Sequence, residues 1–201
     1  MTYRTEASMS LERPMFYPKD RQEWRAWLAE NHATSKVIWL ITYKKDSGQP
    51  TVPYDEAVEE ALCYGWIDST VNKLDEVRAI QMFTPRKAKS PWSGLNKRRI
   101  ESLMQQGLMM PPGLAKIEIA KKDGSWLLYD DIETLTIPPD LQQALAANAS
   151  ANTFFEAFSP SVKKGILWWI KTAKRAETRA KRIEDTVRLA SQNKRAQFDR
   201  E

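Results

Sequence analysis

The sequence contains very little of the two residue types that most often build metal centres and nucleophilic sites. It has one cysteine, Cys63, and one histidine, His32, in 201 residues. A single cysteine excludes an intramolecular disulfide and a cysteine-based metal cluster, and a single histidine argues against a His-rich zinc site. We therefore expect no metal and no other cofactor. Catalysis by a Cys63–His32 pair is not expected either, because Cys63 adjoins Leu62 in a buried pattern and free cysteine commonly behaves as a small hydrophobic residue.

Long hydrophobic runs are also absent. No segment approaches the roughly 18 apolar residues that span a bilayer, and the first ten residues lack the apolar run of a signal peptide. We expect a cytoplasmic protein without a membrane span. A Gly-rich phosphate loop, a paired-carboxylate motif and a nucleophile elbow are missing as well, so no reaction class is indicated.

What the sequence has is an ordinary globular composition with an uneven charge. Hydrophobic residues make up 42% and charged residues 28%, and the length suits one domain with a smaller helical appendage. Residues 160–201 contain 12 Lys/Arg and 5 Asp/Glu, whereas the other 159 residues contain 19 and 21. The positive charge therefore belongs to the C-terminal region.

The hydrophobic patterns predict an α+β fold, with a small antiparallel sheet wrapped by helices and a C-terminal helical module. Strands are expected at 37–43, 67–74 and 78–84, and helices at 21–32, 54–64, 91–106, 114–122 and 141–148. Asp20, Ser90 and Ser159 are the expected helix caps. From residue 160 a narrow apolar stripe predicts a long helical region, suited to docking on the body or pairing with another helix. We divide the chain into a leader (1–15), an α+β body (16–130) and a helical module (138–195), with 130–139 as a linker.

Two segments carry a family resemblance: Ala61-Leu-Cys-Tyr-Gly-Trp-Ile-Asp68, and Thr84-Pro-Arg-Lys-Ala-Lys-Ser-Pro-Trp-Ser93. Further matching motifs are Ser159-Pro-Ser and Glu177-Thr-Arg-Ala-Lys-Arg-Ile183. Over most of its length the chain resembles the YdeI/OmpD-associated proteins, a bacterial family named for bacteriocin protection and porin association. Relatives often have proline where this chain has Ala176, so a continuous helix is possible here. The resemblance implies a fold and a stress- or bacteriocin-protection role, but no reaction. Porin association would require export, which the N-terminus does not predict.

The same segments place polar and aromatic residues at element ends, where side chains usually serve a site. The candidate ligand-binding residues are Trp66, Asp68, Arg86, Ser90, Trp92 and Asn96. A helix beginning at Ser90, with Lys87 and Lys89 nearby, would favour an anion through its free N–H groups and its dipole. The hypothesis is a pocket for a phosphorylated or carboxylated small molecule, with Trp66 and Trp92 as stacking walls.

A purely structural interpretation stays open for each of these residues. Asp68 and Arg86 could form a bidentate salt bridge between two loops. Ser90 could be only a helix cap, and Trp66 and Trp92 could be core residues.

Three functions therefore remain after the sequence analysis. We favour a cytoplasmic, non-catalytic protein that either binds an anionic small molecule or has a stress- or bacteriocin-protection role. The alternatives are a small-molecule enzyme in which Asp68 is the base or acid and Arg86 clamps an anion, and weak nucleic-acid binding through Arg179 and Arg182. Nucleic acid is not the expected partner, because the basic region lacks the interleaved aromatic residues of single-strand binders.

Overall fold

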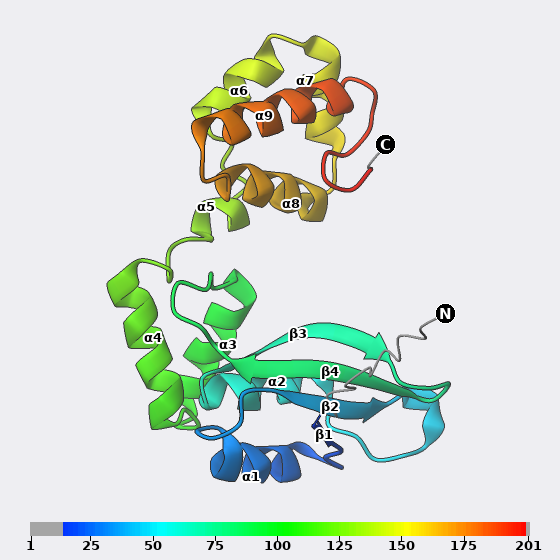
Figure 1. Ribbon diagram of the computed structural model, residues 1–201, viewed down its shortest axis with the longest axis vertical. Helices are drawn as coiled ribbons and strands as arrows, with labels where there is room; N and C mark the ends of the chain where they lie inside the picture. The colour runs from blue at the N-terminus through cyan, green and yellow to red at the C-terminus, as the bar shows by residue number, and fades with distance from the viewer. Residues whose placement is uncertain (1–13, 200–201) are drawn as a thin grey trace, which may run out of the picture. The chain divides into compact units, whose positions relative to one another are not determined.

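A computed structural model describes residues 14–199, and these residues form two units (Figure 1). The first unit comprises residues 14–90 and 95–125, and the second comprises residues 91–94 and 126–199. The expected leader, 1–15, lies outside the described residues except for its last two. Of these, Met15 pairs with Trp39 in a strand.

The sheet of the first unit has four strands in the order β1-β2-β4-β3. Their bounds are Met15–Phe16 (β1), Ile38–Tyr43 (β2), Trp66–Lys73 (β3) and Arg78–Pro85 (β4). The last three form antiparallel pairs, as predicted, with a register shift between Asp68 and Val71. The predicted α+β fold with a small antiparallel sheet is confirmed for these three strands, and a fourth strand, β1, joins β2 in parallel. Two residues of strand are too few for a hydrophobic pattern to predict.

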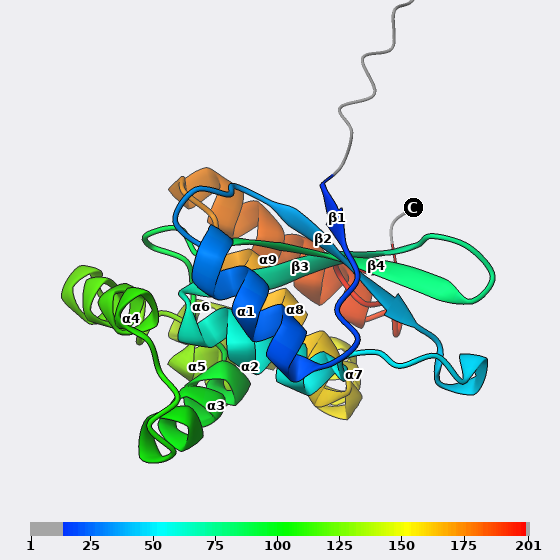
Figure 2. The same cartoon turned by 90° about the horizontal axis from the view of Figure 1, so that it is seen from below.

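Helices α1 (Arg21–Asn31) and α2 (Tyr54–Cys63) cover one face of this sheet (Figures 1 and 2). The α1 cap is confirmed, because the Asp20 side chain accepts a hydrogen bond from the Glu23 N–H at 2.9 Å. Between the helices and the sheet lies an apolar core. Its largest fully buried side chains include Trp24, Leu28, Leu40, Trp66 and Phe83. Burial of these apolar side chains is the main force that holds the sheet against its helices.

The other two helices of this part of the chain are α3 (Gly94–Gln105) and α4 (Pro111–Asp123). The predicted start of α3 at Ser90-Pro91 is wrong. Lys89 has φ +61°, and the Ser90 hydroxyl donates to the Lys87 carbonyl at 2.8 Å, so the chain makes a turn before the helix begins. Helix α4 begins earlier than predicted and includes two prolines, since a first helical turn needs no N–H bond from them.

The second unit is helical throughout and has its own core. Its helices are α5 (Asp130–Glu133), α6 (Pro139–Ala146), α7 (Ala149–Ala157), α8 (Pro160–Lys171) and α9 (Ala176–Ala190). Fully buried core residues include Leu141, Phe155, Ile166 and Ile170. The cap at Ser159 is confirmed, because its side chain accepts the Val162 N–H.

In the second unit one expectation is corrected and one open alternative is decided. The expected linker 130–139 contains helix α5, whose Ile132 is buried in the core of this unit. The helical region after residue 160 is not continuous, since α8 ends at Lys171 and α9 begins at Ala176. The break lets α9 fold back and pack Ile183 and Leu189 into the same core. Among the described residues, no helix is both long and apolar enough to cross a membrane.

Candidate functional site

Six polar side chains of the first unit form what we call the polar cluster. Its members are Tyr54, Asp68, Gln81, Arg86, Asn96 and Arg99. Four of them, Gln81, Arg86, Asn96 and Arg99, are buried, whereas Asp68 is half-buried and Tyr54 is 51% exposed. The cluster thus has a buried polar interior and a rim that reaches solvent. Buried polar side chains of this kind are costly unless they are hydrogen-bonded.

Asp68 on β3 connects two elements of the cluster. Its Oδ2 atom accepts a hydrogen bond from the Tyr54 hydroxyl at 3.0 Å and another from Gln81 Nε2 at 2.8 Å. Tyr54 is the first residue of α2, and Gln81 lies on β4. Burial, followed by the charge of Asp68, raises the pKa of Tyr54. The phenol is therefore a proton donor to the carboxylate at neutral pH.

Arg99 on α3 supplies one of the two cations of the cluster. Its guanidinium donates to Asn96 Oδ1 at 3.0 Å and to the Asp55 carboxylate. It also lies over the ring of Tyr54, 5.8 Å from the centroid. The Asp55 side chain is 75% exposed, so the buried guanidinium is neutralised by a carboxylate at the surface.

Arg86 supplies the second cation, immediately after strand β4. Its backbone N–H donates to the Gly65 carbonyl at 2.9 Å, which fixes the chain as it leaves the sheet. Burial lowers the pKa of Arg86 to about 10, and the charge of Asp68 acts in the opposite direction. A salt bridge between Asp68 and Arg86 was one interpretation of the sequence. Within residues 14–199, Asp68 instead bonds Tyr54 and Gln81 and forms no ion pair with Arg86.

The two predicted stacking walls are core residues. Trp66 is 1% exposed, and its indole N–H donates to the His32 carbonyl at 3.2 Å. Trp92 is equally buried, belongs to the second unit and packs on Trp126 with ring centroids 5.2 Å apart. Neither indole offers a face to a ligand, so both are corrected to structural positions.

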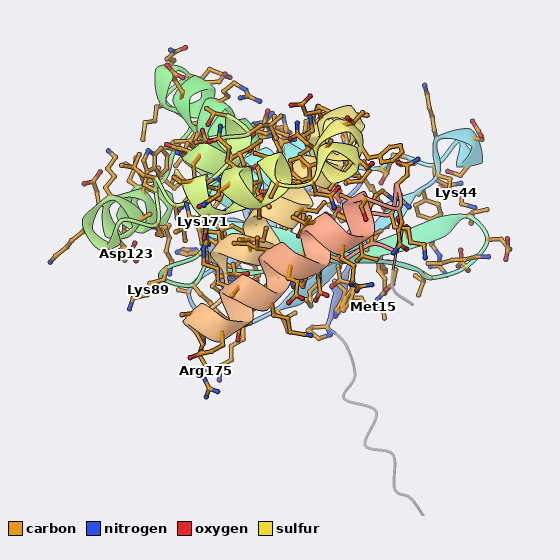
Figure 3. All side chains as sticks on the ribbon, turned by 90° about the horizontal axis from the view of Figure 1, so that it is seen from above. Met15, Lys44, Lys89, Asp123, Lys171 and Arg175 are labelled. Atoms are coloured by element: carbon orange, nitrogen blue, oxygen red, sulfur yellow. The ribbon has the colours of Figure 1, made fainter. Side chains whose placement is uncertain are left out.

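The predicted anion site at the start of α3 is also corrected. The N–H of Gly94, the first residue of this helix, already donates to Glu133 Oε1 at 3.0 Å, and Lys164 pairs with the same carboxylate. The Glu133 carboxylate is favourable at this helix start because it interacts with the positive end of the helix dipole, the same effect that suggested an anionic ligand there. In the preceding turn the Lys89 N–H donates to Asp123 at 3.0 Å, and the two residues lie near each other in Figure 3.

The geometry argues against the nucleophile that the sequence offers. Burial raises the pKa of the Cys63 thiol to about 11, so the reactive thiolate is disfavoured. His32 lies at the end of α1, with Nδ1 2.9 Å from the Leu28 carbonyl and its ring beside Tyr64. Among the described residues, no group of His, Cys, Asp and Glu side chains is arranged to hold a metal ion.

The two arginines considered for nucleic-acid binding make contacts within the second unit. Arg179 donates two hydrogen bonds to Asp140, at 2.7 and 2.9 Å. Arg182 donates to the Trp169 carbonyl and lies over the Trp169 ring at 5.1 Å. These contacts hold the start of α9 against α6 and the end of α8.

Sequence reasoning missed three members of the polar cluster, Tyr54, Gln81 and Arg99. Gln81 interrupts the apolar run of β4, and Arg99 lies three residues after Asn96 on one helix face. Both patterns mark polar positions inside a core, and they are the signal that could have identified Gln81 and Arg99 as candidates, though not their partners. In the second unit, sequence reasoning also missed a groove of about 910 Å³ between α6 and α9. Its lining includes four alanines, Ala144, Ala147, Ala176 and Ala180.

Comparison with known families agrees with this division of the chain. Residues 16–116 match the model of a domain of unknown function (DUF8412), and since the match covers half of the chain, the protein belongs to this family. Residues 134–193 match the family described as Bacteriocin-protection, YdeI or OmpD-Associated, which confirms the resemblance predicted from the sequence for the helical module. No curated protein and no solved structure gives a significant match.

Proposed function

We propose that this protein binds a small molecule with an anionic group at the polar cluster of its first unit. The observation that supports the proposal is that the buried Arg99 guanidinium pairs with the exposed carboxylate of Asp55, in a cluster whose rim reaches solvent. A guanidinium binds carboxylate or phosphate oxygens through strong, directional hydrogen bonds.

The route to Arg99 is through its exposed partner. Asp55 lies at the surface, so water can solvate its carboxylate when it leaves Arg99, and a ligand anion that takes its place keeps the buried guanidinium paired. The Asp55 carboxylate can therefore turn into solvent at small cost when a ligand presents its own anionic group to Arg99. Asp55 in this view holds the position of a ligand oxygen in the unliganded protein.

We assign the site to binding rather than catalysis. The second unit matches a family described by bacteriocin protection, and this match supports a protective role for the binding activity. No part of the proposal depends on a metal or a nucleophile.

The test is the thermal unfolding of the full chain in the presence of a panel of anions. The panel contains inorganic phosphate, nucleoside monophosphates, sugar phosphates and simple carboxylic acids. A ligand at 100 times its dissociation constant should add about 2.7 kcal/mol to the free energy of unfolding. The Arg99→Gln variant should lose this stabilisation, whereas Arg98→Gln should keep it, because Arg98 is the exposed neighbour on the same helix. If no anion of the panel raises the melting temperature, the proposal fails.

A second candidate function, a small-molecule enzyme with Asp68 as the proton acceptor, is favoured by one observation. The hydroxyl of the exposed residue Tyr54 hydrogen-bonds to the half-buried Asp68 carboxylate, and such a pair can exchange a proton with a bound substrate. Incubation of the protein with each anion that binds, followed by NMR, separates the two functions. A new product that the Asp68→Asn variant does not form would establish catalysis.

A further inference from the structure

The carboxylate of Asp68 is held rigidly by bonds to only one of its oxygens. Oδ2 accepts both hydrogen bonds, from Tyr54 and from Gln81. None of the described residues donates a hydrogen bond to Oδ1. An ionised carboxylate has about four acceptor positions on its two oxygens, so Oδ1 retains its full capacity.

The two bonds to Oδ2 also fix the direction in which Oδ1 points. Gln81 is buried on a central strand, and Tyr54 is anchored at the start of a helix. A donor that binds Oδ1 therefore has no need to order the carboxylate first, which lowers the entropic cost of binding. A preorganised acceptor in a half-buried position is suited to a ligand rather than to bulk water alone.

The polar cluster consequently offers fixed charges of both signs. A ligand that carries only an anionic group gains from the guanidinium groups but is repelled by Asp68. A ligand that carries a positive N–H donor beside its anionic group can bind the guanidinium side with the anionic group and Asp68 with the donor. An ammonium group forms a stronger hydrogen bond with a carboxylate than a neutral N–H or O–H donor does, because both partners are charged.

We infer that the ligand of the polar cluster is a small zwitterion, whose anionic group binds the arginine side and whose primary ammonium group donates to Asp68 Oδ1. This inference rests on the proposed function and narrows it to one class of ligand. Aminoalkyl phosphates and amino acids belong to this class. Tyr54 and Gln81 are positioning residues in this scheme, because they act on the ligand through Asp68.

Three phosphate esters of similar size test the inference by isothermal titration calorimetry with the full chain. Phosphoethanolamine has an ammonium group with N–H donors, phosphocholine has a cation without N–H donors, and ethyl phosphate has no cation. We expect phosphoethanolamine to bind at least about tenfold more tightly than ethyl phosphate, as one charge-assisted hydrogen bond provides. The affinity for phosphocholine should be close to that for ethyl phosphate. β-Alanine and propionate form the corresponding pair for a carboxylate ligand, with the same order expected.

Variants distinguish the donor contact from a general electrostatic effect. In Asp68→Asn the preference for phosphoethanolamine should disappear while ethyl phosphate still binds. Tyr54→Phe, which removes one of the two bonds that orient Asp68, should reduce the preference in part. Asp46→Asn makes the same chemical change as Asp68→Asn but at an exposed position, and it should leave the preference for phosphoethanolamine unchanged. Circular dichroism and the melting temperature show whether each variant is folded.

The outcomes separate this inference from the proposed function. Equal affinities within both ligand series would overturn the zwitterion while leaving an anion site. A preference that survives in folded Asp68→Asn would also overturn it, because the donor would then bind elsewhere. If none of the five compounds binds while another anion of the thermal-unfolding panel does, the inference fails and the proposed function stands.

Discussion

The backbone of Gly113, in the first turn of α4, lies directly against the carbonyl oxygen of Cys63 at the end of α2. A Cβ atom at Gly113 would overlap that oxygen and would lie 2.7 Å from the Leu62 carbonyl oxygen. Both obstacles are backbone atoms, which cannot move aside as a flexible side chain can. The two helices can approach this closely only because residue 113 has no side chain.

Replacement of Gly113 by Ala should therefore destabilise the protein. Overpacking of a close contact typically costs about 1–3 kcal/mol, and we expect the upper part of this range because both clashes involve backbone. Urea unfolding followed by tryptophan fluorescence measures the change. Leu114→Ala, at an exposed neighbouring position, should cost less than about 0.5 kcal/mol. Equal effects for the two variants would show that the helices can separate freely.

The Glu60 carboxylate should be the most sensitive charged group of the first unit. It is 1% exposed and accepts hydrogen bonds from Arg21 and Arg25, each at 2.6 Å. Because both arginines are partly exposed, we expect Glu60→Gln to cost about 2–4 kcal/mol, somewhat less than the loss of a fully buried pair. Glu59→Gln is the matched control, since Glu59 also pairs with Arg21 but lies nearer to solvent. Chemical denaturation of both variants tests this order, and a larger loss for Glu59→Gln would contradict it.

The Cys63 thiol should make stability fall in alkaline solution. Burial raises its pKa from 9.0 to about 11 in the folded chain. Between these values the unfolded chain has lost the thiol proton and the folded chain has kept it. Stability is therefore complete below pH 9 and falls as the pH rises towards 11, by at most about 1.4 kcal/mol per pH unit. In the Cys63→Ala variant the free energy of unfolding should fall less steeply with pH over this range. Denaturant unfolding at a series of pH values measures the difference.

The same burial predicts the chemical reactivity of Cys63. At pH 8 a thiol reagent should modify the folded protein very slowly and the denatured protein rapidly, because only the thiolate reacts. Fast modification of the folded chain would mean that the helix containing Cys63 opens readily.

The ion pair between Asp140 and Arg179 should make the second unit sensitive to acid. Hydrogen bonds from Arg179 hold the pKa of Asp140 below its ordinary value. A depressed carboxylate pKa contributes stability above the unfolded value, about 3.9, and that contribution is lost as the pH falls through the folded value. Both side chains are partly exposed, so we expect an effect of no more than about 1 kcal/mol. Melting curves between pH 2 and pH 7 should show a smaller acid loss for Asp140→Asn than for the unmodified protein.

The sequence by itself determined most of the secondary-structure elements. Strands rich in β-branched and aromatic residues, and helices with an apolar face, were predicted at β2, β3, β4, α1 and α2, because local periodicity depends on a few neighbouring residues. The caps at Asp20 and Ser159 followed from short-range geometry as well. The motifs in the second unit predicted its family, since these motifs are contiguous in the chain.

Only the tertiary structure decided the composition of the candidate site. Asp68, Gln81 and Arg99 are brought together from two strands and a helix, and no local pattern shows that pairing. Tertiary contacts also bury Trp66 and Trp92, so neither can line a site. At the start of α3 the Gly94 N–H is bound by Glu133, a residue 39 positions away in the sequence. The physical reason is that a side chain's role depends on the partners that surround it in space, whereas periodicity reports only which face of an element is buried.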